Sequence, residues 1–292
     1  MATREASASI PSSSRRRGPF TLLRDAIDDV VSRRRLVGYL VQADAKKKGA
    51  DSLLGNIWWV LDPLLQMLVY VILVSVILER PEADYPLFIF TAILPWKWFT
   101  SSVNDAIGSI TGQERLIKQV KFPKIVLPTA TTAAGILHFA FGLIPLGALL
   151  VLFYHDRMSM NLVFVPVIAM VQLVFTLALC YVVAAVNVFY RDVANLSRHV
   201  LRLWFYLSPA LYGASALARI GNSHPTLMQL FHYNPFYTLF TSYRNVIYGT
   251  TTGAPSGPEW GGLLALTVAS LVLLALAAIF FKRLEPAFAK VL

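Results

Sequence analysis

Long apolar runs recur along most of the chain and are separated by short polar segments. A membrane-spanning helix needs roughly 20 mostly apolar residues, and five runs meet that requirement: 58–78, 85–103, 125–154, 162–189 and 260–281. A further run, 203–217, is shorter and is interrupted by Pro209. The pattern predicts an all-α integral membrane protein with six transmembrane helices per chain, within residues 58–282.

The stretch after the broken fifth run is also unusual. Residues 234–249 are again mostly apolar, although they include Arg244. Irregular backbone at membrane depth is tolerated only where it is buried in protein or lines a cavity. We therefore expect a re-entrant hairpin between spans five and six, within about residues 218–250 on the extracellular side.

The region before the first span has two parts. Residues 1–19 are rich in serine and arginine and lack the apolar stretch of a signal peptide, so they predict a disordered basic cytoplasmic tail. In the following segment, 20–57, Phe20, Leu23 and Ile27 recur at helical spacing between charged residues. This pattern predicts an amphipathic helix lying in the cytoplasmic interface, with a docking surface for a soluble partner as the alternative.

Composition agrees with a membrane protein. Of the 292 residues, 56% are hydrophobic and 14% are charged, whereas a soluble domain carries about 25% charged residues. No part of the chain is left over for a separate soluble domain. The single cysteine, Cys180, lies inside an apolar run, so neither a disulfide framework nor a thiolate metal site is expected.

The positive charges follow membrane sides. Lysine and arginine number eleven in residues 1–57, four in 105–125, three in 187–203 and three after Phe281, whereas the opposite loops hold only Arg80, Arg157, Arg219 and Arg244. The positive-inside rule then predicts a plasma-membrane protein with both termini in the cytoplasm, including residues 283–292. The net charge of +10 is thus explained by topology, without a nucleic-acid partner.

A short charged segment, about 108–123, joins the second and third predicted spans. On a helix, Glu114, Lys118 and Lys121 share one face, while Leu116 and Val120 point away from it. Prolines follow it and lead into the next span. The simpler interpretation is a solvated loop that obeys the positive-inside rule. The alternative is a rigid helix that transmits force from a cytoplasmic motor to the membrane helices.

Six motifs in order carry a resemblance to a known family. They are "LLGNIWWVLDPLLQMLVY", "FIFTAILPWKWF", "RLIKQVKFPKIVLP", "NVFYRDV", "FYLSPALY" and "NPFYTLFTSYRNVIYG". From about Leu53 to the end, the chain resembles the membrane (permease) subunit of ABC-2 type polysaccharide exporters, the O-antigen and teichoic-acid export group. Within that group it is most similar to the galactan exporter of actinobacterial cell walls.

The resemblance implies an assembly of two copies of this chain with two copies of a separate ATPase, exporting a lipid-linked polysaccharide through the membrane. No GxxxxGK[ST] loop is present, so ATP and magnesium are expected in the partner, with no cofactor and no enzymatic activity in this chain. The segment 108–123 would be the coupling helix that docks on the ATPase. Glu114, Arg115 and Lys118 would contact the ATPase, with Lys121 on the same surface, while Leu116 and Val120 would seat the helix.

Aromatic residues supply a predicted path for the polymer, because sugars present flat apolar faces as well as hydroxyl groups. In the first, second and fifth spans, which the family uses around its pore, these rings belong to Tyr70, Trp96, Trp98, Phe99, Phe205, Tyr206 and Tyr212. Lys97 lies among them and either contacts the glycan or its phosphate, or extends from a helix end toward water. Arg244 either holds the re-entrant segment together or meets the pyrophosphate of a lipid carrier.

Three other functional classes fit the sequence less well. An ion-driven transporter needs carboxylates near the middle of the membrane, but only Asp62 of the sixteen acidic residues lies within a predicted span. A membrane glycosyltransferase needs clustered carboxylates or histidines, and the five histidines are scattered. An ABC-2 exporter of a drug or a lipid remains the nearest alternative, since a shared fold does not name the cargo.

Overall fold

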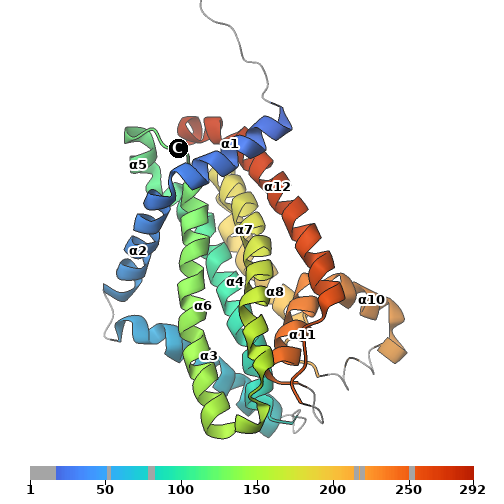
Figure 1. The fold of residues 1–292 in the computed structure, drawn as a ribbon. Coiled ribbons are helices and arrows are strands. Elements are labelled where there is room, and N and C mark those ends of the chain that lie inside the picture. Colours follow the sequence, from blue (N-terminus) through green and yellow to red (C-terminus); the bar gives the residue numbers. More distant parts are fainter. Residues whose placement is uncertain (1–17, 51–53, 78–82, 214–216, 218–220, 250–253) are drawn as a thin grey trace, which may run out of the picture.

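The computed structural model describes residues 18–50, 54–77, 83–213, 217, 221–249 and 254–292, and every regular element in them is helical (Figure 1). Residues 1–17 of the predicted tail lie outside this part, as do Arg80 and Arg219. The first half of the chain forms α1 (Pro19–Ser32), α2 (Arg34–Ala50), α3 (Trp58–Val71), α4 (Tyr85–Ser109), α5 (Glu114–Gln119) and α6 (Val126–Phe153). The second half forms α7 (Val165–Phe189), α8 (Val193–Tyr206), α10 (Pro225–Tyr233), α11 (Pro235–Ile247) and α12 (Trp260–Val291).

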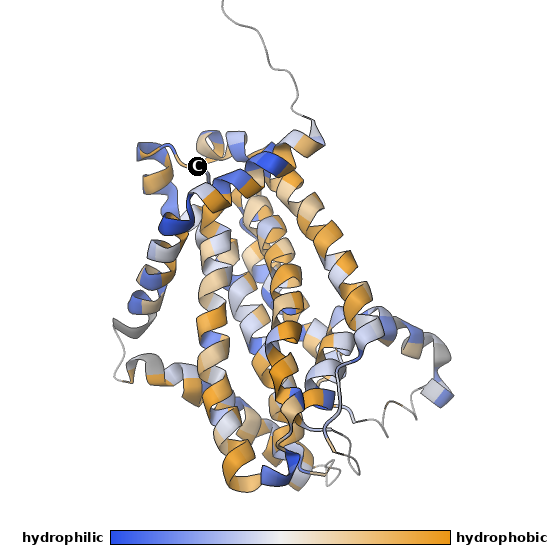
Figure 2. Ribbon diagram, in the orientation of Figure 1, coloured by the Kyte–Doolittle hydropathy of each residue, from blue (hydrophilic) through white to orange (hydrophobic). Residues whose placement is uncertain are grey.

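Four described helical segments are long and apolar enough to cross a membrane. They are α3 with its π-helical extension (Trp58–Ile77), α6, α7 with the turn before it (Met160–Phe189), and α12. Each matches one of the predicted long spans. Figure 2 shows hydrophobic residues along α6, α7 and α12, while hydrophilic residues gather on α1, α2 and α5 at one end of the bundle. The chain is therefore a multi-pass, all-helical membrane protein.

The helix α4 also forms where a span was predicted, but it is less apolar than these four because prolines, hydroxyl groups and Lys97 interrupt it. It lies at the centre of the bundle and contacts α3, α6, α7, α8 and α11. Buried Gln172 of α7 donates a hydrogen bond to the Pro95 carbonyl oxygen of α4 at 2.7 Å and accepts one from the Tyr243 hydroxyl of α11 at 3.2 Å. One side chain thus joins three helices.

The fifth predicted span is placed differently from the expectation. The apolar run 203–217 predicted a helix there, whereas α8 begins ten residues earlier, at Val193, and ends at Tyr206. Pro209 explains the end of the helix, because proline cannot donate the next backbone hydrogen bond and its ring blocks the preceding turn. The start follows the turn at Tyr190–Asp192, so Arg198 and Arg202 lie on the helix and not in a loop before it.

The segment predicted as one surface helix forms two. A break at Arg33 separates α1 from α2, and the two helices then take different directions (Figure 1). α1 crosses the end of the bundle, where Leu22 and Ala26 are buried, whereas α2 runs alongside α6. The segment is therefore divided into one helix that crosses the end of the bundle and one that follows its side.

At the end of the bundle that carries α1 and α5, a second apolar cluster joins distant parts of the chain. It includes Ala26 of α1, Ile117 of α5, Ile125 before α6, and Phe281 and Phe288 of α12. The last residues of the chain also lie at this end (Figure 1). The charged segment between α4 and α6 is thus packed against α12, although more than 150 residues separate them.

Candidate functional site

A groove of about 330 Å³ lies between α3, α4 and α8. It combines aromatic rings with amide, hydroxyl and guanidinium groups, and its walls are formed by Gln66, Tyr70, Trp96, Thr100, Asn104, Arg198, Leu201, Arg202, Phe205 and Tyr206. Four of the predicted path residues, Tyr70, Trp96, Phe205 and Tyr206, are therefore brought together from three helices that are distant in sequence.

Ring contacts hold the aromatic side of this groove in place. The centroid of the Phe205 ring lies 5.3 Å from that of Trp96, 5.7 Å from that of Tyr70 and 5.7 Å from that of Tyr206. Trp96 packs in turn against Phe236 of α11, with 4.7 Å between centroids in an edge-to-face arrangement. Offset and edge-to-face pairs of this kind are favourable and fix ring orientation. The groove thus has a rigid aromatic wall, with the ring of Tyr206 exposed on it.

Two arginines on α8 were not predicted to belong to the site. Arg198 and Arg202 lie one helical turn apart, and Phe205 and Tyr206 follow on the same side, so the four line one groove. Arg198 is oriented by hydrogen bonds to the side chain of Asn195 and the carbonyl oxygen of Ala194. The signal was present in the sequence as a spacing of four between the arginines, but starting the fifth span at Leu203 left both outside it.

The remaining predicted path residues lie elsewhere. Trp98 and Lys97 line a second cavity of about 230 Å³ between α3, α4 and α6, where Lys97 forms an ion pair with Asp62. Phe99 is fully buried among Phe175, Trp204 and Phe236 and belongs to the core. Tyr212, beyond the end of α8, donates a hydrogen bond to the Tyr206 carbonyl oxygen at 3.5 Å. Successive helical residues point about 100° apart, so neighbours on α4 do not share one surface.

The charged segment between α4 and α6 contains a short helix, as predicted. Its buried residue is Ile117, which packs into the apolar cluster described above. Leu116 and Val120 were expected to seat the helix, but both side chains are exposed, as are Arg115 and Lys121. Ile117 lies one position after Leu116, about 100° around the helix, so the face that packs against the bundle carries Ile117, while Leu116 and Val120 remain exposed.

An ion pair stiffens this helix on its charged side. Lys118 Nζ lies 2.6 Å from Glu114 Oε1, at a spacing of four residues, and also donates to the Leu292 carbonyl oxygen at 2.6 Å. The hydrogen bond from Lys118, followed by the charge of its ammonium group, lowers the pKa of Glu114 below its ordinary value. Glu114 is therefore ionised at neutral pH, and α5 presents a fixed charged edge beside two exposed apolar side chains.

Comparison with known proteins assigns the chain to a family. The O-antigen export system permease protein RfbA of Myxococcus xanthus is 36% identical over 251 residues, which cover 86% of this chain and 93% of the relative. The chain belongs to the ABC-2 family of polysaccharide-export permeases. Two relatives of the same name from Klebsiella pneumoniae are each 26% identical over 258 residues, covering 88% of this permease and 95% of each relative. No family model matches the chain.

Arg244, in the predicted re-entrant part of this permease, is buried and contacts other segments of the same chain. Its guanidinium donates to the Pro209 carbonyl oxygen at 2.6 Å and to the Ala210 carbonyl oxygen, and it stacks over the Phe88 ring at 3.8 Å. It thereby ties α11 to the segment after α8 and to α4. Of the two roles left open by the sequence, this geometry favours holding the segment together.

Within the described residues of this permease, no three histidine, cysteine, aspartate or glutamate side chains come together in a way that would hold a metal ion. The relatives are named as permease proteins, which are the transport subunits of export systems.

Proposed function

We propose that this chain is the membrane subunit of an ATP-driven exporter that moves a lipid-linked polysaccharide outward across the plasma membrane. In the most specific form of the proposal, this polysaccharide is a galactan. Two copies of the chain would assemble with two copies of an ATPase, which would supply ATP and magnesium. Each copy would span the membrane six times, with α11 in a re-entrant segment at the extracellular exit. Membership of the permease family supports the class of transport, and the groove supports the class of cargo.

The observation that carries the choice of cargo is the aromatic wall of the groove between α3, α4 and α8. Rings of this kind stack on the flat apolar faces of sugars, while Gln66, Thr100 and Asn104 offer hydrogen bonds to hydroxyl groups. Arg198 and Arg202 would bind the phosphate groups of a lipid carrier, because guanidinium groups pair well with phosphate. A groove for an apolar drug would not need this polar side.

The distribution of positive charge supports the proposed orientation of the chain in the membrane. α1 and α5 lie at one end of the bundle (Figure 1), together with most of the lysines and arginines that the positive-inside rule assigns to the cytoplasm. Both termini would then be cytoplasmic. The exposed edge of α5 would dock on the ATPase and receive its movement. It carries Arg115 and Leu116 beside the Glu114–Lys118 pair, and Val120 and Lys121 follow directly after the helix.

Polysaccharide export in cells that lack the native gene tests the cargo. Replacement of Tyr206 by alanine removes an exposed ring from the groove and leaves the core intact, and the matched control is Leu207→Ala, an exposed neighbour outside it. Losing one stacking partner should lower surface glycan by roughly three- to tenfold. Normal glycan export by Tyr206→Ala, with normal expression, would argue for a different path or cargo.

The docking role of α5 needs a separate experiment. The complex of this chain with its ATPase is purified in lipid nanodiscs as wild type and as Glu114→Ala plus Lys118→Ala. We expect the variant to assemble but to hydrolyse ATP without a matching rate of glycan export. If assembly, hydrolysis and export are all unchanged, α5 is only a positively charged loop on the cytoplasmic side.

A further inference from the structure

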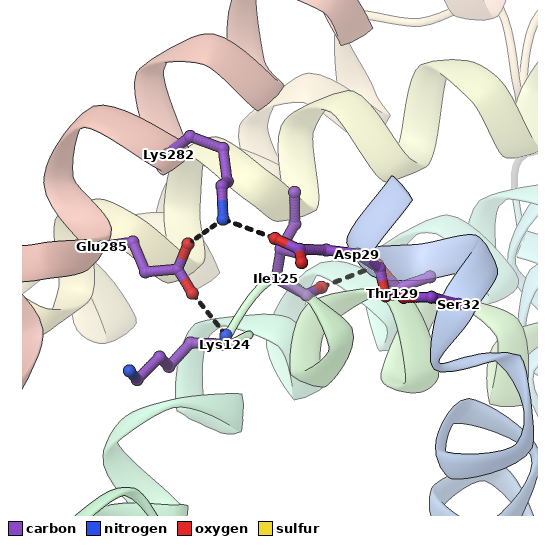
Figure 3. A network of polar contacts seen from close by, with 7 residues as sticks. All are labelled: Asp29, Ser32, Lys124, Ile125, Thr129, Lys282 and Glu285. Atoms are coloured by element: carbon purple, nitrogen blue, oxygen red, sulfur yellow. Dashed lines mark hydrogen bonds and ion pairs between the residues drawn. The ribbon is translucent and has the colours of Figure 1, made fainter. Parts of the chain in front are cut away.

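Beyond the groove and α5, a compact set of charged groups connects three parts of the chain (Figure 3). Lys282 Nζ of α12 lies 2.7 Å from Asp29 Oδ2 of α1 and 2.5 Å from Glu285 Oε2 of α12 itself. The other oxygen of the Glu285 carboxylate accepts a hydrogen bond from the backbone N–H of Lys124 at 2.6 Å. We call the groups of Asp29, Lys124 N–H, Lys282 and Glu285 the ionic joint.

The ionic joint is sheltered, unlike the charged edge of α5. The side chains of Lys282 and Glu285 are 11% and 10% exposed, and that of Asp29 is 29% exposed. Taking charges out of water is costly, so a sheltered ion pair adds little net stability compared with apolar packing. It does fix the geometry of its partners, because breaking one contact leaves a charge without compensation. Such a cluster therefore fixes the relative positions of the segments that it joins, and it adds little to the free energy of unfolding.

The ionic joint adjoins the predicted coupling segment, 108–123, where this segment leads into α6. Lys124 is four residues beyond Val120 on the short connection from α5 to α6. Ile117 of α5 and Ile125 of this connection belong to the same apolar cluster as Phe281 and Phe288 of α12. A second polar contact, from Lys118 to the Leu292 carbonyl oxygen, joins α5 to the last residue of the chain. Any displacement of α5 therefore acts on α12 through both apolar and charged contacts.

α12 continues without interruption to the opposite end of the bundle. From Glu285 back to Gly262 the helix extends about 35 Å at 1.5 Å per residue. There it lies against α11 so closely that a Cβ added at Gly262 would be 2.9 Å from Cγ2 of Thr238. α12 is thus held at one end by the ionic joint and packed at the other end against α11, so it connects these two parts of the chain.

We propose that the ionic joint transmits movement of the α5 segment to α12 and α1, and that α12 carries this movement to α11. This rests on the proposed function, because it requires α5 to be the part that the ATPase moves. Lys282 is then a positioning residue: its ammonium group holds α1 and the Lys124 connection, through Glu285, in one body with α12. Loss of the joint uncouples hydrolysis from export without removing any group that contacts ATP or cargo.

The first test measures hydrolysis and export together in the assembled complex. Lys282→Met removes the charge and keeps the length of the side chain, Lys282→Arg keeps the charge, and Arg283→Gln removes an exposed neighbouring charge as the control. We expect Lys282→Met to hydrolyse ATP within twofold of wild type and to export at least tenfold less glycan per ATP. Lys282→Arg and Arg283→Gln should retain the wild-type ratio. Unchanged export per ATP in Lys282→Met overturns the proposal.

Lys282→Met leaves two sheltered carboxylates unpaired, so a second variant guards against simple misfolding. The triple variant Asp29→Asn, Lys282→Met, Glu285→Gln has no charge left at the joint, and its glutamine side chain still accepts the hydrogen bond from Lys124 N–H. It should assemble and show the same loss of export per ATP. Parallel losses of assembly, hydrolysis and export in both variants would mean that the joint only supports folding, which also overturns the proposal.

A distance measurement separates failure of this proposal from failure of the proposed function. Spin labels at Val31→Cys on α1 and Ala289→Cys on α12 occupy exposed positions, while native Cys180 is buried. With the ATPase and a non-hydrolysable ATP analogue, and with both labels in only one of the two copies, the unsubstituted joint should give one narrow distance distribution, and Lys282→Met a broad one. This result needs no cargo, so it tests the joint even if no glycan is exported. Equal distributions would show that Lys282 does not hold the two helices together.

Discussion

The helices α4 and α12 differ in how much of their surface the rest of the bundle covers. α4 is surrounded by five other helices and carries prolines, hydroxyl groups and a lysine, whereas α12 is strongly apolar and exposes many leucines and valines on one side. Apolar side chains are required where a helix meets lipid, but a central helix can satisfy polar groups with its neighbours. Hydropathy therefore reports lipid exposure more directly than it reports passage through the membrane.

The difference has a consequence for tolerance to mutation. A side chain on α4 is held by several helices at once, so a change in its volume has no direction in which to relax. A side chain on the outer face of α12 is exposed and has no neighbour from the rest of the described chain to restrict its size. We expect the two helices to respond very differently to the same substitution.

The largest effect should come from truncating a core ring. Phe99 on α4 is 0% exposed and Phe280 on α12 is 40% exposed. Phe99→Ala should cost about 3–5 kcal/mol of unfolding free energy, because the cavity among fixed rings cannot close, while Phe280→Ala should cost far less. Unfolding of both variants in the same detergent measures the difference, and equal losses would remove the distinction between the helices.

An added methyl group should have the next largest effect. A Cβ at Gly135 of α6 would lie 2.2 Å from Ser102 Oγ and 2.9 Å from the Trp98 ring of α4, whereas Gly261 of α12 has no described atom within 4 Å. Gly135→Ala should destabilise by about 1–3 kcal/mol through overpacking. Gly261→Ala should be neutral by the same melting assay.

Adding Ser102→Ala to Gly135→Ala gives an internal check on the cause. The Ser102 oxygen is buried without a hydrogen-bond partner among the described residues, so its removal frees space at little cost. The double variant should recover part of the lost stability. No recovery would place the strain at the Trp98 ring alone.

Removing the link between helices should have a moderate effect. Gln172→Leu loses the hydrogen bonds to the Pro95 carbonyl and the Tyr243 hydroxyl, and should cost about 1–2 kcal/mol. Thr267→Val on α12 loses only a bond to the Leu263 carbonyl within its own helix and should be close to neutral. Thermal unfolding of the pair compares a tie between helices with a local contact.

The smallest effect on stability is expected for the surface ion pair of α5, which lies outside both helices. Glu114 has a lowered pKa because it accepts a hydrogen bond from Lys118, so the pair stabilises α5 above the ordinary pKa of glutamate and is lost as pH falls through the lowered value. Between pH 6 and 8 the pair should contribute no pH dependence to the melting temperature. Glu114→Gln should likewise melt as wild type does, since the side chain is at the surface. A clear shift in either experiment would mean that α5 contributes to the stability of the bundle.

The long spans were predictable because lipid contact demands continuous apolar sequence. The four segments that meet this demand match predicted runs to within a few residues, apart from α12, which extends ten residues past its apolar run to Val291. The same rule misplaced α8, whose amphipathic sequence, with Arg198 and Arg202, reflects a helix with one side in a polar groove. A search for apolar runs passes over such a helix, whereas a search for helical spacing would have found it.

The candidate site was predicted in part for a related reason. Residue type indicated which rings suit a sugar, and Tyr70, Trp96, Phe205 and Tyr206 do share a groove. Which side of α4 each ring occupies depends on the contacts of its neighbours, so Phe99 entered the core and Trp98 a different cavity. Ile117 was passed over because the turn before α5 sets the rotation of that helix, and no periodic pattern extends over six residues.

Gln172 also bears on how this family can change over time. Its amide joins the backbone of α4 to the side chain of Tyr243 on α11, so the three helices share one interlocking contact. A chimera that takes α11 from a relative with another residue at the position of Tyr243 would leave the buried Gln172 amide oxygen without its partner on α11. Exchange of α11 between relatives is therefore expected to preserve the packing of the bundle when α4, α7 and α11 are transferred as one block.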